Sequence, residues 1–178
     1  HCVTRRQRQM CIRDSIHTNL DNNSKGVNFK ICQKLKIKNL NFLIPNKLNE
    51  SIGMGMYGNV ENSYNENDFI KYIKKQMDIK YIRHSKILNK KIEKVAVLGG
   101  SGSFGINNAI EKKIDCYITS DLKYHDFFKA NNKILLLDIG HYESEKFTKE
   151  LIYNYLLKKI PKFACIIANT NTNPVNYY

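Results

Sequence analysis

A histidine and a glutamate that follow an apolar, strand-like run have the side chains and the spacing to bind a divalent metal. His141 and Glu145 come after residues 134–137 and the acid Asp138. In α/β proteins, sites form at the carboxyl ends of such strands. If a helix begins here, positions i and i+4 share one face, and the imidazole and carboxylate converge. Zinc, manganese and iron accept both ligands, although the same spacing also fits a solvated helix pair.

A glycine-rich turn offers a second kind of chemistry. Gly100, Gly102 and Gly105 form a GxGxxG pattern directly after an apolar run, and Asp121 follows the next run. Glycines in this pattern let the backbone approach a pyrophosphate, and a following acid can bind ribose. A tight strand-to-helix turn that holds no nucleotide explains the pattern equally. His125 favours that second interpretation, because an aspartate and a histidine four residues apart suit a polar cleft.

Alternating strand and helix patterns after residue 94 predict that these residues lie in an α/β fold. Strands are expected at residues 95–98, 116–119, 134–138 and 163–167. Helices are expected at residues 104–113, 122–129 and 145–159, the last with Phe147, Leu151, Tyr155 and Leu156 facing inward and ending at Pro161. Short connections between such elements imply right-handed crossovers. We therefore expect a layered, largely parallel sheet flanked by helices.

The first half of the chain gives weaker patterns. Ser24 is a candidate N-cap for a helix with an apolar face at Val27, Ile31 and Leu35. Asp68 favours a second helix that carries Phe69, Ile70, Ile73 and Met77. A short strand is expected at residues 40–44, and the segment 51–65, rich in Gly and Asn, is expected to be a loop.

Composition separates residues 1–15 from the rest. This segment holds four of the five arginines and no lysine, so we expect a non-native or disordered leader, followed by one domain over residues 16–178. The net charge of +13 comes mainly from scattered lysines without a basic block, which argues against a nucleic-acid partner. The sequence has no apolar run of the ~20 residues that cross a bilayer, and its five cysteines lack CxxC pairing. We expect a soluble, cytoplasmic protein without a membrane partner.

Several separated motifs recur, in order, in one known family. They are IHTNLD at residues 16–21, GGSGSF at 99–104, TSDLKYHDFF at 119–128, GHYESE at 140–145 and NTNP at 171–174. Through them, residues 16–178 resemble the Nif-three-like dinuclear metal centre proteins, also called GTP cyclohydrolase I type-two homologues. The resemblance implies a toroidal homohexamer, a dimer of trimers, with two divalent metal ions per subunit. Zinc, iron and manganese are the candidate metals.

The resemblance also implies roles for residues. Asp21, His141 and Glu145 are expected metal ligands, with Glu143 a rival of Glu145. His17, Asp121 and His125 are expected to line the cleft or support the ligands, and His125 is the candidate catalytic residue, which would transfer protons. Family members also have an adjacent His-His pair upstream of the IHTNLD motif, and this sequence has none. We therefore expect a C-terminal two-thirds fragment with a truncated N-terminal lobe.

Three functions remain open at this point. The first is a metal-dependent hydrolase of a small anionic substrate, such as a nucleotide or another phosphate compound, with the amides of residues 101–104 near the anionic group. The second is a non-enzymatic, metal-stabilised hexameric scaffold or interaction protein. The third is a nicotinamide-binding module built on the glycine-rich turn. The cyclohydrolase name comes from the resemblance alone.

Overall fold

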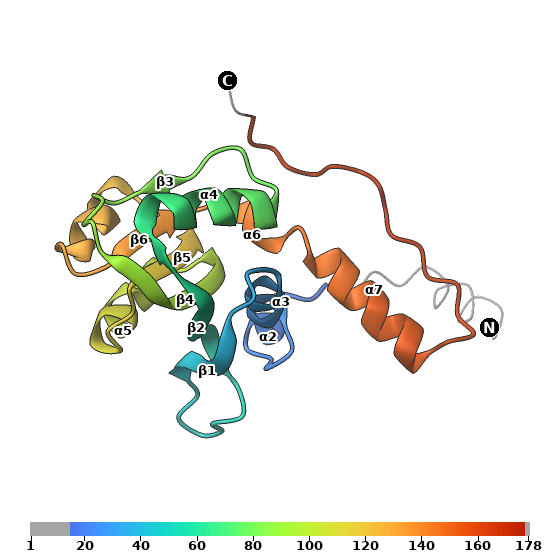
Figure 1. Cartoon of the computed structure of the whole chain (residues 1–178). Helices are drawn as coiled ribbons and strands as arrows, with labels where there is room; N and C mark the ends of the chain where they lie inside the picture. Colours follow the sequence, from blue (N-terminus) through green and yellow to red (C-terminus); the bar gives the residue numbers. More distant parts are fainter. Residues whose placement is uncertain (1–14, 177–178) are drawn as a thin grey trace.

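In the computed structural model, which describes residues 15–176, six strands form one mixed sheet in the order β1-β2-β4-β5-β6-β3 (Figure 1). The strands are β1 (Lys38–Pro45), β2 (Gly53–Asn65), β3 (Arg83–His84), β4 (Lys91–Ser101), β5 (Cys116–Ser120) and β6 (Leu135–Asp138). The strands β4, β5 and β6 run parallel, whereas β1, β2 and β3 pair antiparallel with their neighbours. The predicted α/β class is confirmed, and its parallel part is the β4-β5-β6 unit. The predicted leader lies outside the described residues except for Ser15.

Helices cover both faces of this sheet. They are α2 (Thr18–Asp21), α3 (Val27–Lys34), α4 (Glu66–Met77), α5 (Ile106–Glu111), α6 (His141–Glu145) and α7 (Thr148–Lys159), with 3-10 turns η1 (Ser103–Gly105) and η2 (Tyr124–Ala130). On one face, α3 and α4 pack on Val95 and Val97 of β4. On the other, α5 packs on Ala96 and Leu98. Alternate residues of β4 thus enter two cores, which explains its continuous apolar run.

Two sequence-based predictions about strands are wrong. Residues 51–65 are not a loop, because 53–65 form β2, which pairs with β1 on one side and β4 on the other. Pairing along both edges outweighs the low strand propensity of glycine and asparagine. Conversely, the strand predicted at residues 163–167 is absent from that stretch. Phe163 and Ile166 are exposed there, and no neighbouring strand edge pairs with the segment.

The helix predicted over residues 145–159 is two helices. The helix is interrupted at Lys146 and Phe147, so α6 stays beside the sheet while α7 extends away from it (Figure 1). Phe147 packs against the core as expected, but α7 has no fully buried residue and Tyr155 is exposed. The predicted helix at residues 122–129 is the 3-10 turn η2. None of the described helices is long and apolar enough to cross a membrane.

Candidate metal centre

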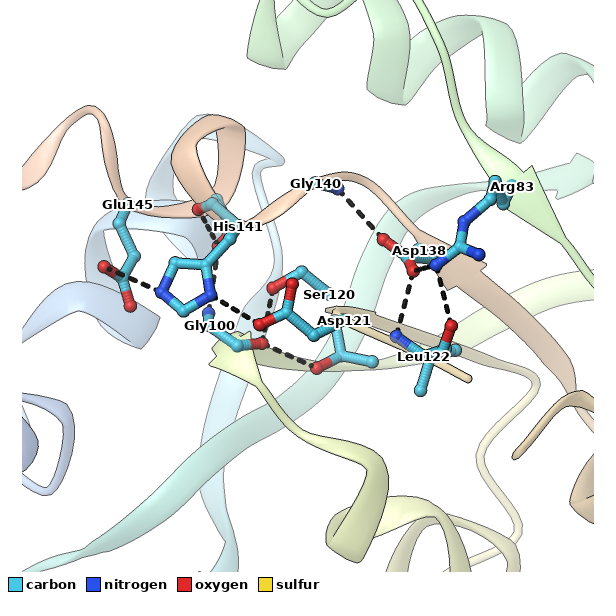
Figure 2. A network of polar contacts seen from close by, with 11 residues as sticks. Arg83, Gly100, Ser120, Asp121, Leu122, Asp138, Gly140, His141 and Glu145 are labelled. Carbon is cyan, nitrogen blue, oxygen red and sulfur yellow. Dashed lines mark hydrogen bonds and ion pairs between the residues drawn. The ribbon is translucent and has the colours of Figure 1, made fainter. Parts of the chain in front are cut away.

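Three parallel strands deliver the polar residues of the candidate site to one edge of the sheet. Gly100 lies at the end of β4, Asp121 follows β5, and His141 begins α6 just after β6. Because the carboxyl ends of parallel strands meet at one edge, these residues come together although they are far apart in sequence. Figure 2 shows His141 between Asp121 on one side and Glu145 on the other.

The imidazole of His141 is fixed by one carboxylate and faces a second. Its Nδ1 lies 2.6 Å from Oδ2 of Asp121. An ionised carboxylate only accepts hydrogen bonds, so Nδ1 carries the proton and the neutral ring keeps a lone pair on Nε2. That nitrogen is 3.6 Å from Oε2 of Glu145. Two ligands of one tetrahedral ion stand about 3.4 Å apart, so the pair fits a divalent metal.

Electrostatic interactions connect Asp21 to this pair. Burial raises the pKa of Asp21 above its usual value, and the negative charge of Glu145 raises it further, while His17 and His141 lower it. Asp21 therefore lies within electrostatic range of both expected ligands. Within residues 15–176, however, no three His, Cys, Asp or Glu side chains converge closely enough to hold a metal ion. The arrangement is thus a histidine–glutamate pair within electrostatic range of a third acid, Asp21.

The same neighbours shift the protonation of His141. The hydrogen bond to Asp121 raises the pKa of His141 most, burial opposes this, and the charges of Glu145, Asp121 and Asp21 add to the rise. A negative environment of this kind favours a cation at the ring, whether a proton or a metal ion. A divalent ion at Nε2 would therefore have to compete with a proton.

Two buried polar side chains that the sequence patterns did not predict join the segments of Asp21 and His141 to β4. Asn28 donates to the carbonyl of Asp21 at 3.0 Å and accepts from the amide of Gly99 at 2.8 Å. The hydroxyl of Ser144 accepts from the amide of Gly100 at 2.9 Å and donates to the carbonyl of His141 at 2.8 Å. The one available signal was an asparagine among the apolar positions of α3.

The glycine-rich turn is explained by packing within the protein. Gly100 has a φ of +70°, and a Cβ there would lie 2.7 Å from Oε1 of Glu145. A Cβ on Gly102 or Gly105 would lie 2.8 or 2.5 Å from the hydroxyl of the buried Tyr117. The carboxylate of Asp121, the expected ribose ligand, is bonded to His141 instead. Contact between the amides of residues 101–104 and an anion stays a prediction.

Two other predicted site residues have different surroundings. His125 is exposed on η2, where its ring lies beside Tyr124 and Phe128, with centroids 5.2 and 6.4 Å away. The structure therefore groups His125 with aromatic rings and not with His141, and its proton-transfer role stays a prediction. Glu143 accepts a hydrogen bond from Asn173 at 3.2 Å, so it has a partner in the C-terminal segment.

A cavity of about 620 Å³ borders the site. Its lining includes the site residues Asp121, His141, Glu143 and Glu145. Three cationic side chains, Arg83, Lys146 and Lys149, line the same cavity. Ligand cavities for small molecules commonly have this size. The cavity thus brings acidic, basic and imidazole groups together around one space.

The protein has an α/β fold with one mixed sheet. A histidine–carboxylate pair lies at the strand ends beside a polar cavity, which makes the protein a candidate metal-binding protein. The Duf34/NIF3 (NGG1p interacting factor 3) family model matches residues 9–174, and the chain belongs to this family. The matched range begins inside the segment 1–15, most of which lies outside the described residues. The family predicted from the ordered motifs is therefore confirmed.

Proteins similar in sequence include the GTP cyclohydrolase 1 type 2 homolog of Staphylococcus epidermidis, 33% identical over 140 residues, which are 76% of this chain and 38% of the relative. The Campylobacter jejuni homolog of the same name is 32% identical over 120 residues, covering 67% of this chain and 47% of that protein. This chain spans less than half of the length of these curated relatives.

Solved structures show the same fold. The Staphylococcus aureus protein SA1388 superposes with a TM-score of 0.85 at 26% identity, covering 98% of this chain and 71% of that one. A Bacillus cereus protein related to NIF3 superposes with a TM-score of 0.84 at 19% identity, covering 91% of this chain and 72% of that one. The latter similarity concerns the fold alone.

Proposed function

We propose that this chain contributes Asp21, His141 and Glu145 to a dinuclear divalent-metal site, and that the protein is a metal-dependent hydrolase. The observation that carries the proposal is the pair of contacts around His141. Its Nδ1 is held by Asp121 at 2.6 Å while its Nε2 faces Glu145 at 3.6 Å. A metal-ligating histidine usually has this kind of carboxylate partner on its other nitrogen.

The donor set indicates which metals fit. Imidazole nitrogen and carboxylate oxygen are ligands of zinc, iron and manganese. Gly100 leaves the space beside Glu145 open, since a Cβ there would meet its carboxylate. In the proposal, Asp21 would be a further ligand, since it lies within electrostatic range of Glu145 and His141.

We expect the cavity beside the site to bind a small anionic substrate. Bound divalent ions would lower the pKa of a water molecule and stabilise a leaving oxygen. Asp121 orients the ring of His141 through Nδ1. Lys146 and Lys149 place ammonium groups on the cavity wall, where they could contact a phosphate or carboxylate group. A nucleotide or another phosphate compound is the substrate class that we propose.

Metal analysis of the purified protein tests the proposal. We expect bound zinc, iron or manganese by mass spectrometry, and loss of most of it in His141→Ala and Asp21→Asn. His84→Ala is the matched control, since His84 is also exposed and its Nδ1 bonds the backbone carbonyl of Ser85, just after β3. An untreated protein without metal, or a His141→Ala variant that retains its metal, would refute the assignment.

A scaffold function is the second candidate, and a run of exposed apolar side chains favours it. Tyr155, Leu157, Ile160, Phe163 and Ile166 are exposed on α7 and just after it, and such a surface is typical of an association interface. In that proposal, six copies form a metal-stabilised ring. Bound metal and a hexameric mass by light scattering, without turnover of a panel of nucleotides and phosphoesters, would favour the scaffold over the hydrolase.

The free thiols of Cys32, Cys116 and Cys165 fit a cytoplasmic location.

A further inference from the structure

Asp138, at the end of β6, is a buried carboxylate that bonds two distant parts of the chain and the turn that follows its own strand. Its side chain is 4% exposed. Oδ2 accepts from the amide of Leu122 at 3.0 Å and from the guanidinium of Arg83, and Oδ1 accepts from the amide of Gly140 at 3.1 Å. Figure 2 shows these contacts beside the His141 cluster. Arg83 supplies the positive charge that a buried carboxylate requires.

The two amides belong to the immediate neighbours of site residues. Leu122 follows Asp121, and Gly140 precedes His141. Both segments turn sharply here, since φ is +56° at Asp121 and +88° at Gly140. A left-handed conformation is unfavourable for a residue with a Cβ, so outside contacts help to keep Asp121 in it. The amide of Leu122 provides one such contact through Asp138.

We propose that Asp138 is a positioning residue that holds Asp121 and His141 within hydrogen-bonding distance. One rigid carboxylate sets the distance between the two segments, because each of its oxygens binds one of them. The Asp121 carboxylate then meets Nδ1 of His141, and Nε2 is turned toward Glu145. Asp138 touches neither Nε2 of His141 nor the carboxylate of Glu145 in any described contact, so it acts through Asp121 and His141.

Asp138→Asn removes this double link with little change in shape. The two segments bond different oxygens of Asp138, so the single amide oxygen of asparagine reaches only one of them, and its NH₂ group faces a backbone donor at the other. Glu66→Gln is the matched control, because Glu66 is buried and accepts from the amides of Leu88 and Asn89 at 2.8 and 2.7 Å. Both variants remove a buried carboxylate that anchors a backbone segment.

The metal-free protein gives the first measurement. We expect faster amide hydrogen exchange at Leu122 or Gly140 in Asp138→Asn, and loss of the NMR signal of the His141 Nδ1 proton. In Glu66→Gln both should match the wild type at a similar loss of unfolding free energy. Unchanged exchange and an unchanged Nδ1 signal in Asp138→Asn would overturn the inference. Where Asp138→Asn does not fold, Asp138→Glu keeps the charge opposite Arg83 but displaces the oxygens, and the same changes are expected.

The second measurement rests on the proposed function. We expect zinc affinity to fall by about 10–100-fold in Asp138→Asn, as is usual when a group supporting a metal ligand is removed, and to be unchanged in Glu66→Gln. Equal affinities in Asp138→Asn and the wild type would contradict the positioning role. If the wild type binds no zinc, the proposed function fails, and the exchange and Nδ1 measurements still decide the role of Asp138.

Discussion

Replacing Gly100 by alanine should damage the site more than the fold. The backbone at Gly100 has a φ of +70°, and a residue with a Cβ pays about 1–2 kcal/mol there. The Cβ would also lie 2.7 Å from Oε1 of Glu145 and 3.7 Å from Cε1 of His141. The carboxylate is the far end of a flexible side chain, so it moves away and adds little to the loss of unfolding free energy. In moving, however, it leaves Nε2 of His141.

Chemical denaturation and zinc titration separate the two effects. We expect the free energy of unfolding of Gly100→Ala to fall by about 1–2 kcal/mol, while zinc affinity falls at least tenfold, equivalent to about 1.4 kcal/mol of binding energy. Gly55→Ala is the matched control, with a φ of +65° and its nearest contacts on Val97 and Leu43 in the sheet. It should lose similar stability and no zinc affinity. Equal affinity losses in the two variants, or none in Gly100→Ala, would refute the reasoning.

Three further predictions concern protonation and reactivity. Asp121→Asn should weaken zinc binding about 10–100-fold with little effect on stability, since Asp121 is exposed; competition with a chromophoric chelator measures the loss. Zinc affinity should also fall as the pH is lowered, because the proton competes for Nε2. The fall should begin above the usual His pKa of 6.5, since the Asp121 hydrogen bond raises the pKa of His141. A zinc affinity independent of pH between about 6 and 8, a range around that ordinary value, would argue against His141 as a ligand. Burial raises the pKa of Cys32 to about 12 and that of Cys116 well above its ordinary value. Among the three cysteines of residues 15–176, alkylation mapped by mass spectrometry should therefore modify the partly exposed Cys165 before the other two, and equal rates at Cys165 and Cys32 would contradict the buried position of Cys32.

The sequence predicts those elements whose own residues determine them. The apolar run at residues 95–98 is the centre of β4, and the 3.6-residue spacing of Phe69, Ile73 and Met77 is the buried face of α4. Elements that depend on distant partners are predicted poorly. Residues 53–65 become a strand because β1 and β4 pair with both edges, and residues 163–167 form none because no strand edge is available to them.

The contacts of the candidate site are likewise of two kinds, those within one helix and those between distant segments. The spacing of His141 and Glu145 is local. As expected for positions i and i+4 of one helix, α6 brings Nε2 of His141 to 3.6 Å from Oε2 of Glu145. The contact between Asp121 and His141 depends on the parallel pairing of β5 and β6, which puts Thr119 opposite Asp138. No pattern within one segment of the sequence predicts which residues of β5 and β6 lie side by side. Asn28, Ser144 and Asp138 were missed for the same reason, since each joins segments that only the folded sheet brings together.

These three buried polar residues also explain why the strand ends form a fixed site. An apolar side chain in the same place would avoid the cost of about 1–3 kcal/mol that a buried polar group incurs when it is unpaired. Each of the three instead satisfies two backbone groups, one of which lies on or next to a proposed ligand: Asn28 bonds the carbonyl of Asp21, Ser144 the carbonyl of His141, and Asp138 the amide of Gly140, which precedes His141. Among residues 15–176, the one buried side-chain N or O atom without a hydrogen-bond partner is the hydroxyl of Thr148, outside this network. A polar network that is satisfied throughout restricts its backbone to one arrangement. The sheet edge therefore fixes the direction of His141, and its rigidity comes from the groups behind the ligands as much as from the ligands themselves.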